Sequence, residues 1–600
     1  MKYILTALLL LSGIITQAQK NWWDNTVAYE IFVRSFYDTN ADGRGDFNGI
    51  TAKLDYLNAI NSNDDLGVGL IWLMPINPSP SYHGYDVTNY KTVNPQYGSI
   101  NDFKNFVDAA HARNIRVIID LVINHTSTQH PWFIKSAAND PFYRNFYRWE
   151  NNPPNQQGPW GQQVWYPRNG SNYYALFWSG MPDLNFNYAP VRDSIFDIAK
   201  FWIKEMNVDG FRLDAAMYLY EEGNTLKNHP NTINFWKALN DSCEVWKANT
   251  LLLGEVWDAP EVVQLYNGAL DVCFDFNLAD KNLQSINSSN PQDARIALKS
   301  TQEIYPNNQF ASFLTNHDIN RVFDVLGNNT DKAKAAASLL LTQPGLPFLY
   351  YGEEVGMKGV KPDEDIRRPM QWSNATHAGF TTGTPWRALN SNYATYNVSV
   401  MQNDANSLWH HYKKLIDIRL SDSTLMNGNS KNIISSNNVV HSFSRSYKKQ
   451  DIIVLQNTSS TNVDDLFFQY IKSDSSTENF LIKDLLSDSL FFVSANNYKY
   501  NFNIDIPAYG TKILKFVEAL DASLTHRHKE FEVYPNPVSD KLFLRDVHLK
   551  LGEVIEVWDL QGKQILRLEG MGRESIDVSM LQQGLYLLKI GAEYRKFLKN

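Results

Sequence analysis

Three carboxyl groups of this sequence stand at the carboxyl ends of apolar runs that are typical of buried strands. They belong to Asp214, Glu255 and Asp318. A charge in such a place costs free energy unless it is paired or functional. Arg212 lies two residues before Asp214 and therefore projects from the same side of its strand. A carboxylate beside a fixed guanidinium stays ionised at neutral pH, as a nucleophile must, although the pair alone is equally consistent with a structural ion pair.

Three acidic side chains of this kind favour the hydrolysis of glycosidic bonds. The sequence has neither a serine elbow nor a GxGxxG fingerprint, which are the marks of two other common chemistries. A retaining glycosidase needs one ionised carboxylate as nucleophile and one protonated carboxylic acid, roughly 5–5.5 Å apart. The acid needs a raised pKa. Glu255 lies between Gly254 and the apolar Val256-Trp257, so we expect it to be the acid.

Eight strand-like runs alternate with helix-period segments over the first two-thirds of the chain. Parallel strands need a crossover helix between them, so this alternation predicts an α/β fold of the (β/α)8 (TIM) barrel type. The carboxyl ends of the strands meet on one face of such a barrel, where the acidic residues would converge. The predicted strands cover residues 27–36, 68–75, 116–123, 208–213, 250–256, 269–276, 310–314 and 346–351.

The other parts of the chain are predicted to form separate units. Residues 126–188 follow the third strand, are rich in Trp, Tyr, Asn, Pro and Gly, and are too long for an ordinary loop. We expect them to form a subdomain inserted over the barrel mouth. The barrel is expected over 19–430, an antiparallel β-domain over 431–517, a polar linker over 518–530 and a small β-sandwich module over 531–600.

Composition limits the possible partners and the compartment. The 600 residues carry a formal net charge of −9, which argues against nucleic acid as the main partner. Residues 1–18 combine an early Lys, an apolar run and small residues, as a secretory signal peptide does. No later run reaches the ~18 apolar residues of a membrane span, so no transmembrane segment is expected. Two cysteines, Cys243 and Cys273, exclude a disulfide framework or a cysteine-rich metal site.

Five motifs resemble those of the α-amylase family of glycoside hydrolases (family 13), in order and at barrel spacing. They are DLVINHT (120–126), MPDLN (181–185), GFRLDAAMY (210–218), GEVW (254–257) and FLTNHD (313–318). The resemblance covers about residues 21–517. It implies that Asp214 is the nucleophile, Glu255 the general acid/base and Asp318 a third carboxylate that grips the sugar being cleaved. The further residues implied to bind that sugar are Tyr85, His83, His125, Arg212 and His317.

The same resemblance bears on the substrate. SYHGY at 81–85 is similar to the YHGY of α-amylases, and Ala215 after the nucleophile is typical of α-1,4 specificity. These features favour a secreted α-amylase that cleaves internal α-1,4 bonds of starch and maltooligosaccharides with retention. MPDLN is typical of a subgroup intermediate between oligo-1,6-glucosidases and neopullulanases. The alternative is therefore a neopullulanase, cyclomaltodextrinase or oligo-1,6-glucosidase type of enzyme, or a transglycosylase with the same residues.

Two further observations concern that choice. Met217-Tyr218 replaces the Lys-His that many α-amylases have after the nucleophile motif, which leaves the product pattern open. A non-catalytic glucan-binding protein on the same barrel is disfavoured, because such proteins typically lose carboxylates and all three positions here are acidic.

The segment 37–48, YDTNADGRGDFN, predicts a calcium-binding loop. Oxygen-bearing side chains alternate around a turn that contains Gly43 and Gly45, and Ca²⁺ prefers hard oxygen ligands. An EF-hand is excluded because Gly49 stands where its twelfth-position Glu is required. The ligands expected from side chains are Asp38, Asn40, Asp42 and Asp46.

The resemblance adds two calcium predictions. Relatives carry the same loop after the first barrel strand, with the backbone carbonyl at Arg44 as a further ligand. The family's second calcium site, between barrel and insert, would use Asn124, Asp183 and the carbonyl of Tyr218.

The last seventy residues resemble the C-terminal sorting module of proteins exported by the type IX secretion system. The segments FEVYPNPVSDKLFL, IEVWDLQGKQIL and LQQGLYLLKI carry this resemblance. It implies contact with the secretion machinery, passage through an outer membrane, and release or attachment at the cell surface.

Overall fold

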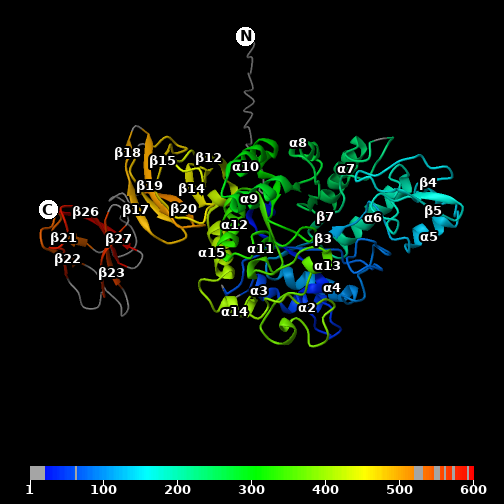
Figure 1. Ribbon diagram of the computed structural model, residues 1–600, viewed down its shortest axis with the longest axis horizontal. Helices are drawn as coiled ribbons and strands as arrows, with labels where there is room; N and C mark the ends of the chain where they lie inside the picture. Colours follow the sequence, from blue (N-terminus) through cyan, green and yellow to red (C-terminus); the bar gives the residue numbers. More distant parts are fainter. Residues whose placement is uncertain are drawn as a thin grey trace, which may run out of the picture.

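The computed structural model describes residues 21–518, except 61, 63, 224, 477 and 497, and residues 532–600, except 546–553, 560–562, 570–574 and 591–592. The expected signal peptide, 1–18, lies outside the described residues, as does nearly all of the expected linker. The molecule is elongated, with the insert at one end, the barrel in the middle and the C-terminal modules at the other end (Figure 1).

Eight parallel strands form a closed barrel, which confirms the predicted (β/α)8 architecture. Each strand falls within its predicted run, and β1 closes the ring by pairing with both β2 and β11. The barrel strands are β1 (Ala28–Ile31), β2 (Leu70–Leu73), β3 (Arg116–Leu121), β7 (Gly210–Leu213), β8 (Leu251–Gly254), β9 (Val272–Phe274), β10 (Phe310–Ser312) and β11 (Leu346–Tyr350).

Aromatic side chains fill the interior of the barrel. Trp72, Phe274 and Phe348, from three different strands, pack with ring centroids 5.1–6.2 Å apart. Aliphatic residues of the same cluster complete the filling. The barrel is therefore a solid core, and a ligand has to bind at its end rather than inside it.

Amphipathic helices cover the outside of the barrel. α4 (Ile100–His111) begins with a capping box in which Ser99 and Asp102 satisfy each other's backbone N–H groups, and it buries Phe103 and Phe106. The other long helices are α6 (Ala189–Lys204), α7 (Pro230–Trp246), α9 (Phe276–Ser288), α10 (Gln292–Ile304), α12 (Thr330–Thr342) and α15 (Leu408–Ser421).

The segment between β3 and α6 forms a small unit of its own. It contains α5 (Pro131–Ala137) and an antiparallel sheet of β4 (Trp149–Glu150), β6 (Ser171–Tyr174) and β5 (Trp165–Arg168). Stacked rings of Phe133 and Trp149, 5.7 Å apart, help to fill its core.

Two antiparallel sheets follow the barrel. The strands are β12 (Asn429–Asn432), β13 (Val440–Tyr447), β14 (Gln450–Asn457), β15 (Val463–Tyr470), β16 (Phe480–Asp484), β17 (Leu490–Val493), β18 (Ala495–Asn496), β19 (Lys499–Ile506) and β20 (Thr511–Glu518). The long strand β15 is irregular at its start. Its register shifts between Val463 and Leu466, and Asp465 has a φ of 51°, so the period-two alternation is broken at its start.

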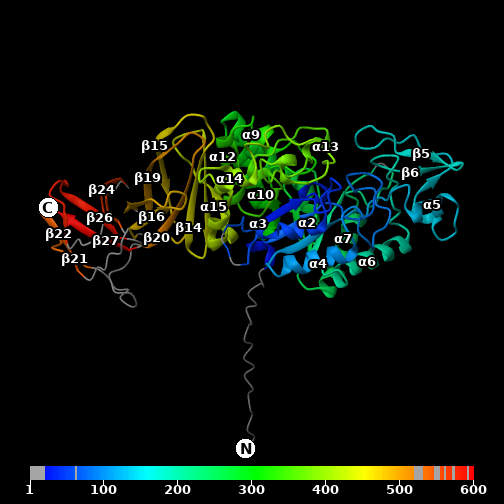
Figure 2. The same cartoon turned by 90° about the horizontal axis from the view of Figure 1, so that it is seen from below.

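A second pair of small sheets ends the chain (Figure 2). Leu587 of this module packs against Leu481 and Leu490 of the preceding sheets. Its strands are β21 (Glu532–Tyr534), β22 (Lys541–Arg545), β23 (Val554–Trp558), β24 (Gln564–Glu569), β25 (Ser575–Asp577), β26 (Gly584–Ile590) and β27 (Glu593–Lys599).

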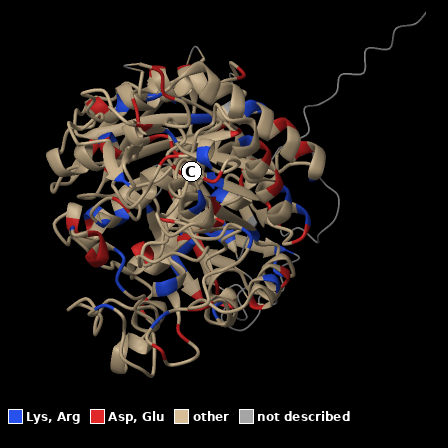
Figure 3. Ribbon diagram, turned by 90° about the vertical axis from the view of Figure 1, so that its right-hand side faces the viewer, with Lys and Arg blue, Asp and Glu red and all other residues tan. Residues whose placement is uncertain are grey.

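Charged residues are spread over the barrel and its helices. Acidic and basic residues are interspersed over the same elements (Figure 3). Within the described part of the chain, no helix has the length and apolar character needed to cross a membrane.

Candidate active site

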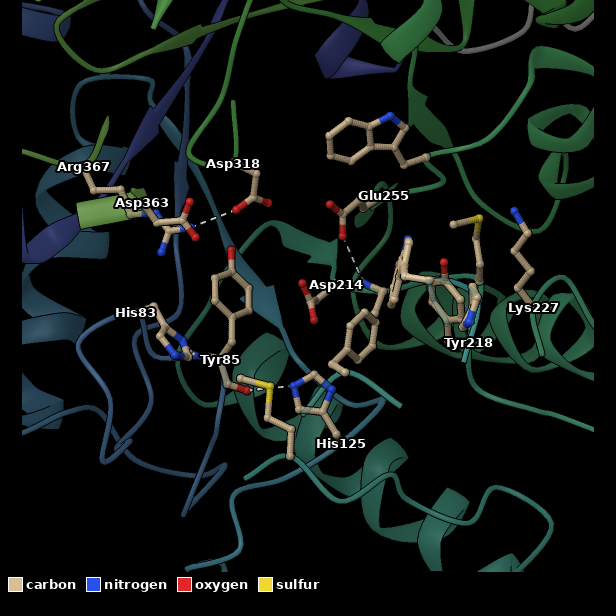
Figure 4. A pocket seen from close by; sticks show the side chains of 17 residues that line it. His83, Tyr85, His125, Asp214, Tyr218, Lys227, Glu255, Asp318, Asp363 and Arg367 are labelled. Atoms are coloured by element: carbon tan, nitrogen blue, oxygen red, sulfur yellow. Dashed lines mark hydrogen bonds and ion pairs between the residues drawn. The ribbon is translucent and has the colours of Figure 1, made fainter. Parts of the chain in front are cut away.

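A cavity of about 740 Å³ lies at the carboxyl ends of the barrel strands. Asp214, Glu255 and Asp318 all line it, together with Tyr85 and His83. The three carboxylates follow β7, β8 and β10 and face one another across the cavity (Figure 4). The structure thus brings together the three acidic residues that the sequence singled out.

Arg212 is buried behind these carboxylates and joins two of them, Asp214 and Glu255. Its Nη1 lies 2.7 Å from Asp120 Oδ1 and 2.9 Å from Asp214 Oδ1. Its Nη2 lies 2.9 Å from Glu255 Oε2. One guanidinium therefore fixes Asp214 and Glu255 relative to each other, because its planar fork allows little freedom.

Burial changes the protonation of this pair. It raises the pKa of Asp214 to about 6, with Arg212 opposing and Asp120 adding to the rise. Burial also raises the pKa of Glu255, again opposed by Arg212, and the neighbouring Asp214 raises it further. A pKa of about 6 leaves Asp214 mostly ionised at neutral pH, although burial outweighs the effect of Arg212 on this pKa.

Asp318 lies on the opposite wall, with the buried His317 beside it. Burial lowers the pKa of His317, but the carboxylates of Asp318 and Glu30 outweigh it and raise this pKa to about 10. The imidazole Nδ1 lies 2.5 Å from Glu30 Oε1 and Nε2 lies 3.2 Å from Asp318 Oδ2. Arg367 donates from Nη2 to Asp318 Oδ1 at 2.8 Å. Burial raises the pKa of Asp318, but the cations His317 and Arg367 reverse this and hold it below its usual range.

Tyr85 closes the floor of the cavity. Its ring stacks on His317 with centroids 5.7 Å apart, and its hydroxyl lies 2.6 Å from His317 Nε2. Its backbone N–H donates to His83 Nδ1 at 3.1 Å. His125 Nε2 lies 3.1 Å from the carbonyl oxygen of Tyr85, and burial lowers the pKa of His125 to about 4, so this imidazole is neutral.

The site residues expected from the sequence occupy two layers. Tyr85, His83 and His125 line the cavity. Arg212 and His317 are almost fully buried and contact the carboxylates rather than the open space. Arg212 therefore positions Asp214 and Glu255, and His317 positions Asp318.

Three residues of this site were not singled out as functional from the sequence. Asp120 and Glu30 are buried carboxylates inside strands, and Arg367 lies in an irregular segment far along the chain. Asp120 and Glu30 carried the same signal as the others, a charge in an apolar run. Arg367 had no such signal, because only the folded chain brings it to Asp318.

The expected calcium loop, 37–48, is held by its own hydrogen bonds. Asp38 accepts the N–H groups of Asn40, Ala41 and Gly43 at 2.8–2.9 Å, and Asp42 accepts that of Arg44 at 2.8 Å. Asp46 caps α2 (Phe47–Ala52). Among the residues that the structure describes, no three acidic, His or Cys side chains converge as a metal cluster. The side-chain atoms with which the loop could bind a metal ion are all oxygens, the ligand type that Ca²⁺ prefers.

Asn124 and Asp183 are neighbours between barrel and insert, as expected. Asn124 Nδ2 donates to Asp183 Oδ2 at 3.2 Å. Burial and the nearby Glu221 raise the pKa of Asp183 well above its usual value. Asn124 Oδ1 and Glu221 Oε1 are buried without a hydrogen-bond partner. An orphaned amide oxygen beside two buried acids fits a hard cation.

The fold and this geometry define a class: a (β/α)8 barrel enzyme whose acidic groups meet at the carboxyl ends of the strands. The chain belongs to the α-amylase family of glycoside hydrolases, because residues 30–428 match the alpha amylase catalytic domain. Residues 532–600 match the secretion system C-terminal sorting domain, which supports export by that route.

The names of similar proteins cover several activities, of which α-amylase and oligo-1,6-glucosidase are two. Alpha-amylase 3 of Dictyoglomus thermophilum is 41% identical over 446 residues, which are 73% of this chain and 85% of that protein. Oligo-1,6-glucosidase of Parageobacillus thermoglucosidasius is 31% identical over 519 residues, covering 74% of this chain and 91% of that protein. The crystal structure of alpha-amylase from H. orenii superposes with a TM-score of 0.73 and 38% identity, covering 82% of this chain and all of that one.

Proposed function

We propose that this protein is an exported α-amylase that hydrolyses internal α-1,4 bonds of starch-like glucans with retention of configuration. The observation that carries the proposal is Arg212, which holds Asp214 and Glu255 at 2.9 Å from two nitrogens of one guanidinium. Two carboxyl groups fixed this closely suit a double displacement, for which a separation of roughly 5–5.5 Å is needed.

The reaction has two balanced steps. Asp214 attacks the anomeric carbon and forms a glycosyl ester, while the bond to the leaving oxygen breaks and Glu255 transfers its proton to that oxygen. A water molecule then gives its proton to Glu255 and its oxygen to the anomeric carbon, which frees Asp214. The raised pKa of Glu255 suits a group that must start protonated.

The remaining residues orient the sugar. Asp318, kept ionised by His317 and Arg367, accepts hydrogen bonds from hydroxyls of the sugar being cleaved. Tyr85 offers an aromatic face to the same ring. His83 and the neutral His125 line the cavity beside it and have polar ring atoms suited to hydroxyl groups.

Linkage specificity separates this proposal from its alternative, an oligo-1,6-glucosidase or neopullulanase type of enzyme. The oligo-1,6-glucosidases among the relatives favour the alternative, while the more similar alpha-amylase and Ala215 favour α-1,4 cleavage. Digestion of amylose, pullulan, isomaltose and cyclodextrin side by side tests both. Rapid loss of iodine staining with few reducing ends supports the α-amylase, and preference for any of the other three substrates overturns it.

We also propose that Ca²⁺ stabilises the fold. The donors at the first site are Asp38, Asn40, Asp42, Asp46 and the Arg44 carbonyl. At the second site Asn124 and Asp183 would bind the ion, joined by Glu221, whose pKa is raised to about 7 by burial. A cation there would offset the repulsion between two buried acids.

Loss of the predicted signal peptide and of residues 532–600 from exported protein, read by mass spectrometry, tests the export route.

A further inference from the structure

The cavity has a second wall, on the side of Glu255 away from Asp318. Tyr218 and Lys227 lie there, while His83, Asp363 and Arg367 lie on the opposite side of the carboxylates (Figure 4). Glu255 protonates the leaving oxygen in the proposed reaction. The wall with Tyr218 and Lys227 therefore faces the departing part of the glucan.

Trp257 gives the cavity a flat, rigid surface. Its ring stacks on Phe276 with centroids 4.4 Å apart and planes 9° apart. The side chain is nevertheless 50% exposed and lines the cavity. One face is thus fixed by packing while the rest is available to the face of a sugar ring.

Lys227 is held in place by the segment that carries the acid. Its Nζ lies 2.6 Å from Asp258 Oδ2, three residues after Glu255. Asn228 Nδ2 donates to the same oxygen at 3.1 Å, and Tyr266 fixes Asn228 through a hydrogen bond of 2.8 Å. An ammonium has three N–H donors, so the pairing with Asp258 occupies one of them and orients the other two.

We propose that Lys227 is a specificity-determining residue of the leaving-group side, where its ammonium donates hydrogen bonds to hydroxyls of the departing sugar. The inference deepens the proposed function and rests on it. Met217-Tyr218, at the end of the nucleophile motif, supply no cation to the leaving side. Lys227, which lies outside that motif, supplies one. The segment Glu255–Asp258 then couples proton transfer to recognition of the leaving sugar.

The test compares two substrates that differ only in their leaving group. Maltopentaose places sugars on the leaving side, whereas α-maltosyl fluoride releases fluoride and places none there. For Lys227→Met we expect kcat/KM to fall on maltopentaose by about tenfold more than on the fluoride, as the loss of a charge-assisted hydrogen bond predicts. Lys227→Arg should recover part of the loss. Lys237→Met is the matched control, since Lys237 is 61% exposed on α7 and pairs with Asp241 at the surface.

Equal losses on both substrates, or no loss on either, overturn the inference. Melting temperatures of all variants verify that the fold is intact. If the wild-type protein cleaves the fluoride but no α-1,4 oligosaccharide, the proposed function fails instead, so the two failures are distinguishable.

Discussion

Arg212 lies on β7 and Glu255 directly follows the adjacent strand β8, and Nη2 of the arginine is 2.9 Å from Oε2 of the glutamate. The same guanidinium also binds Asp214 and Asp120. Three acids therefore share one buried cation. The excess of negative charge raises the pKa of the carboxyl groups towards neutral pH. A mechanism with one ionised and one protonated carboxyl group requires such a pKa.

The first prediction concerns the pH dependence of catalysis. Burial raises the pKa of Asp214 to about 6, and repulsion from Asp120 contributes. kcat/KM should therefore fall below about pH 6, as Asp214 gains a proton, and fall again on the alkaline side as Glu255 loses its own. Asp120→Asn removes the repulsion and should move the acid limb to lower pH. An acid limb that stays in place would contradict this electrostatic account.

The second prediction separates the roles of the two carboxylates. Asp214→Asn should lower kcat by at least about 10⁴-fold on both starch and a maltosyl fluoride, since no nucleophile remains. Glu255→Gln should abolish starch cleavage but retain fluoride release in the first turnover, because fluoride needs no proton to leave. Circular dichroism verifies folding. Equal behaviour of the two variants on the fluoride would refute the assignment.

The third prediction concerns Glu30, which holds His317 from behind. The carboxylates of Asp318 and Glu30 together overcome the effect of burial and raise the folded-state pKa of His317 to about 10, above the ~6.5 of an unfolded chain. Its contribution to stability is therefore complete below about pH 6.5 and is lost as pH rises through about 10. Glu30→Gln should cost about 3 kcal/mol at pH 6, and urea denaturation should show this difference shrinking towards pH 10. Glu150→Gln, on the exposed β4, is the control.

The fourth prediction concerns calcium. Chelation should lower the melting temperature of the wild-type protein, because an ion bound only to the folded state adds stability. Asp42→Ala should reduce that shift, since the side chain of Asp42 contributes only one hydrogen bond within the loop itself, to the Arg44 N–H. Glu221→Gln tests the second site in the same assay. A wild-type melting temperature that does not change when a chelator is added would count against both sites.

The fifth prediction concerns Ala215, which has a φ of 49°. Its N–H donates to Glu255 Oε2 at 3.1 Å, so its backbone helps to orient the acid. A β-branched residue is strained in this left-handed region, and Ala215→Val should cost about 1–3 kcal/mol of stability and lower kcat. Ala215→Gly should change stability far less. Calorimetry of both variants checks this, and equal melting temperatures would disprove the strain.

The sequence by itself determined the barrel and the three carboxylates. Each barrel strand is a run of apolar residues buried on both faces, so the eight runs were visible without the structure. Asp214, Glu255 and Asp318 stood out because a charge at the end of such a run is costly. Within the predicted β-domain the sequence does not delimit strand β15, since the bulge near Asp465 interrupts the alternation on which strand prediction depends.

Only the tertiary structure decided how those groups act on one another. Arg212 pairs with Asp214, but burial outweighs the guanidinium and repulsion from Asp120 adds to the effect of burial, so the pKa of Asp214 rises. Glu30 reaches His317 across 287 positions of sequence, and Arg367 reaches Asp318 across 49. Lys227 lies on the cavity wall because Asp258 holds it there. Burial and distance set these interactions, and neither is encoded in the local pattern of residues.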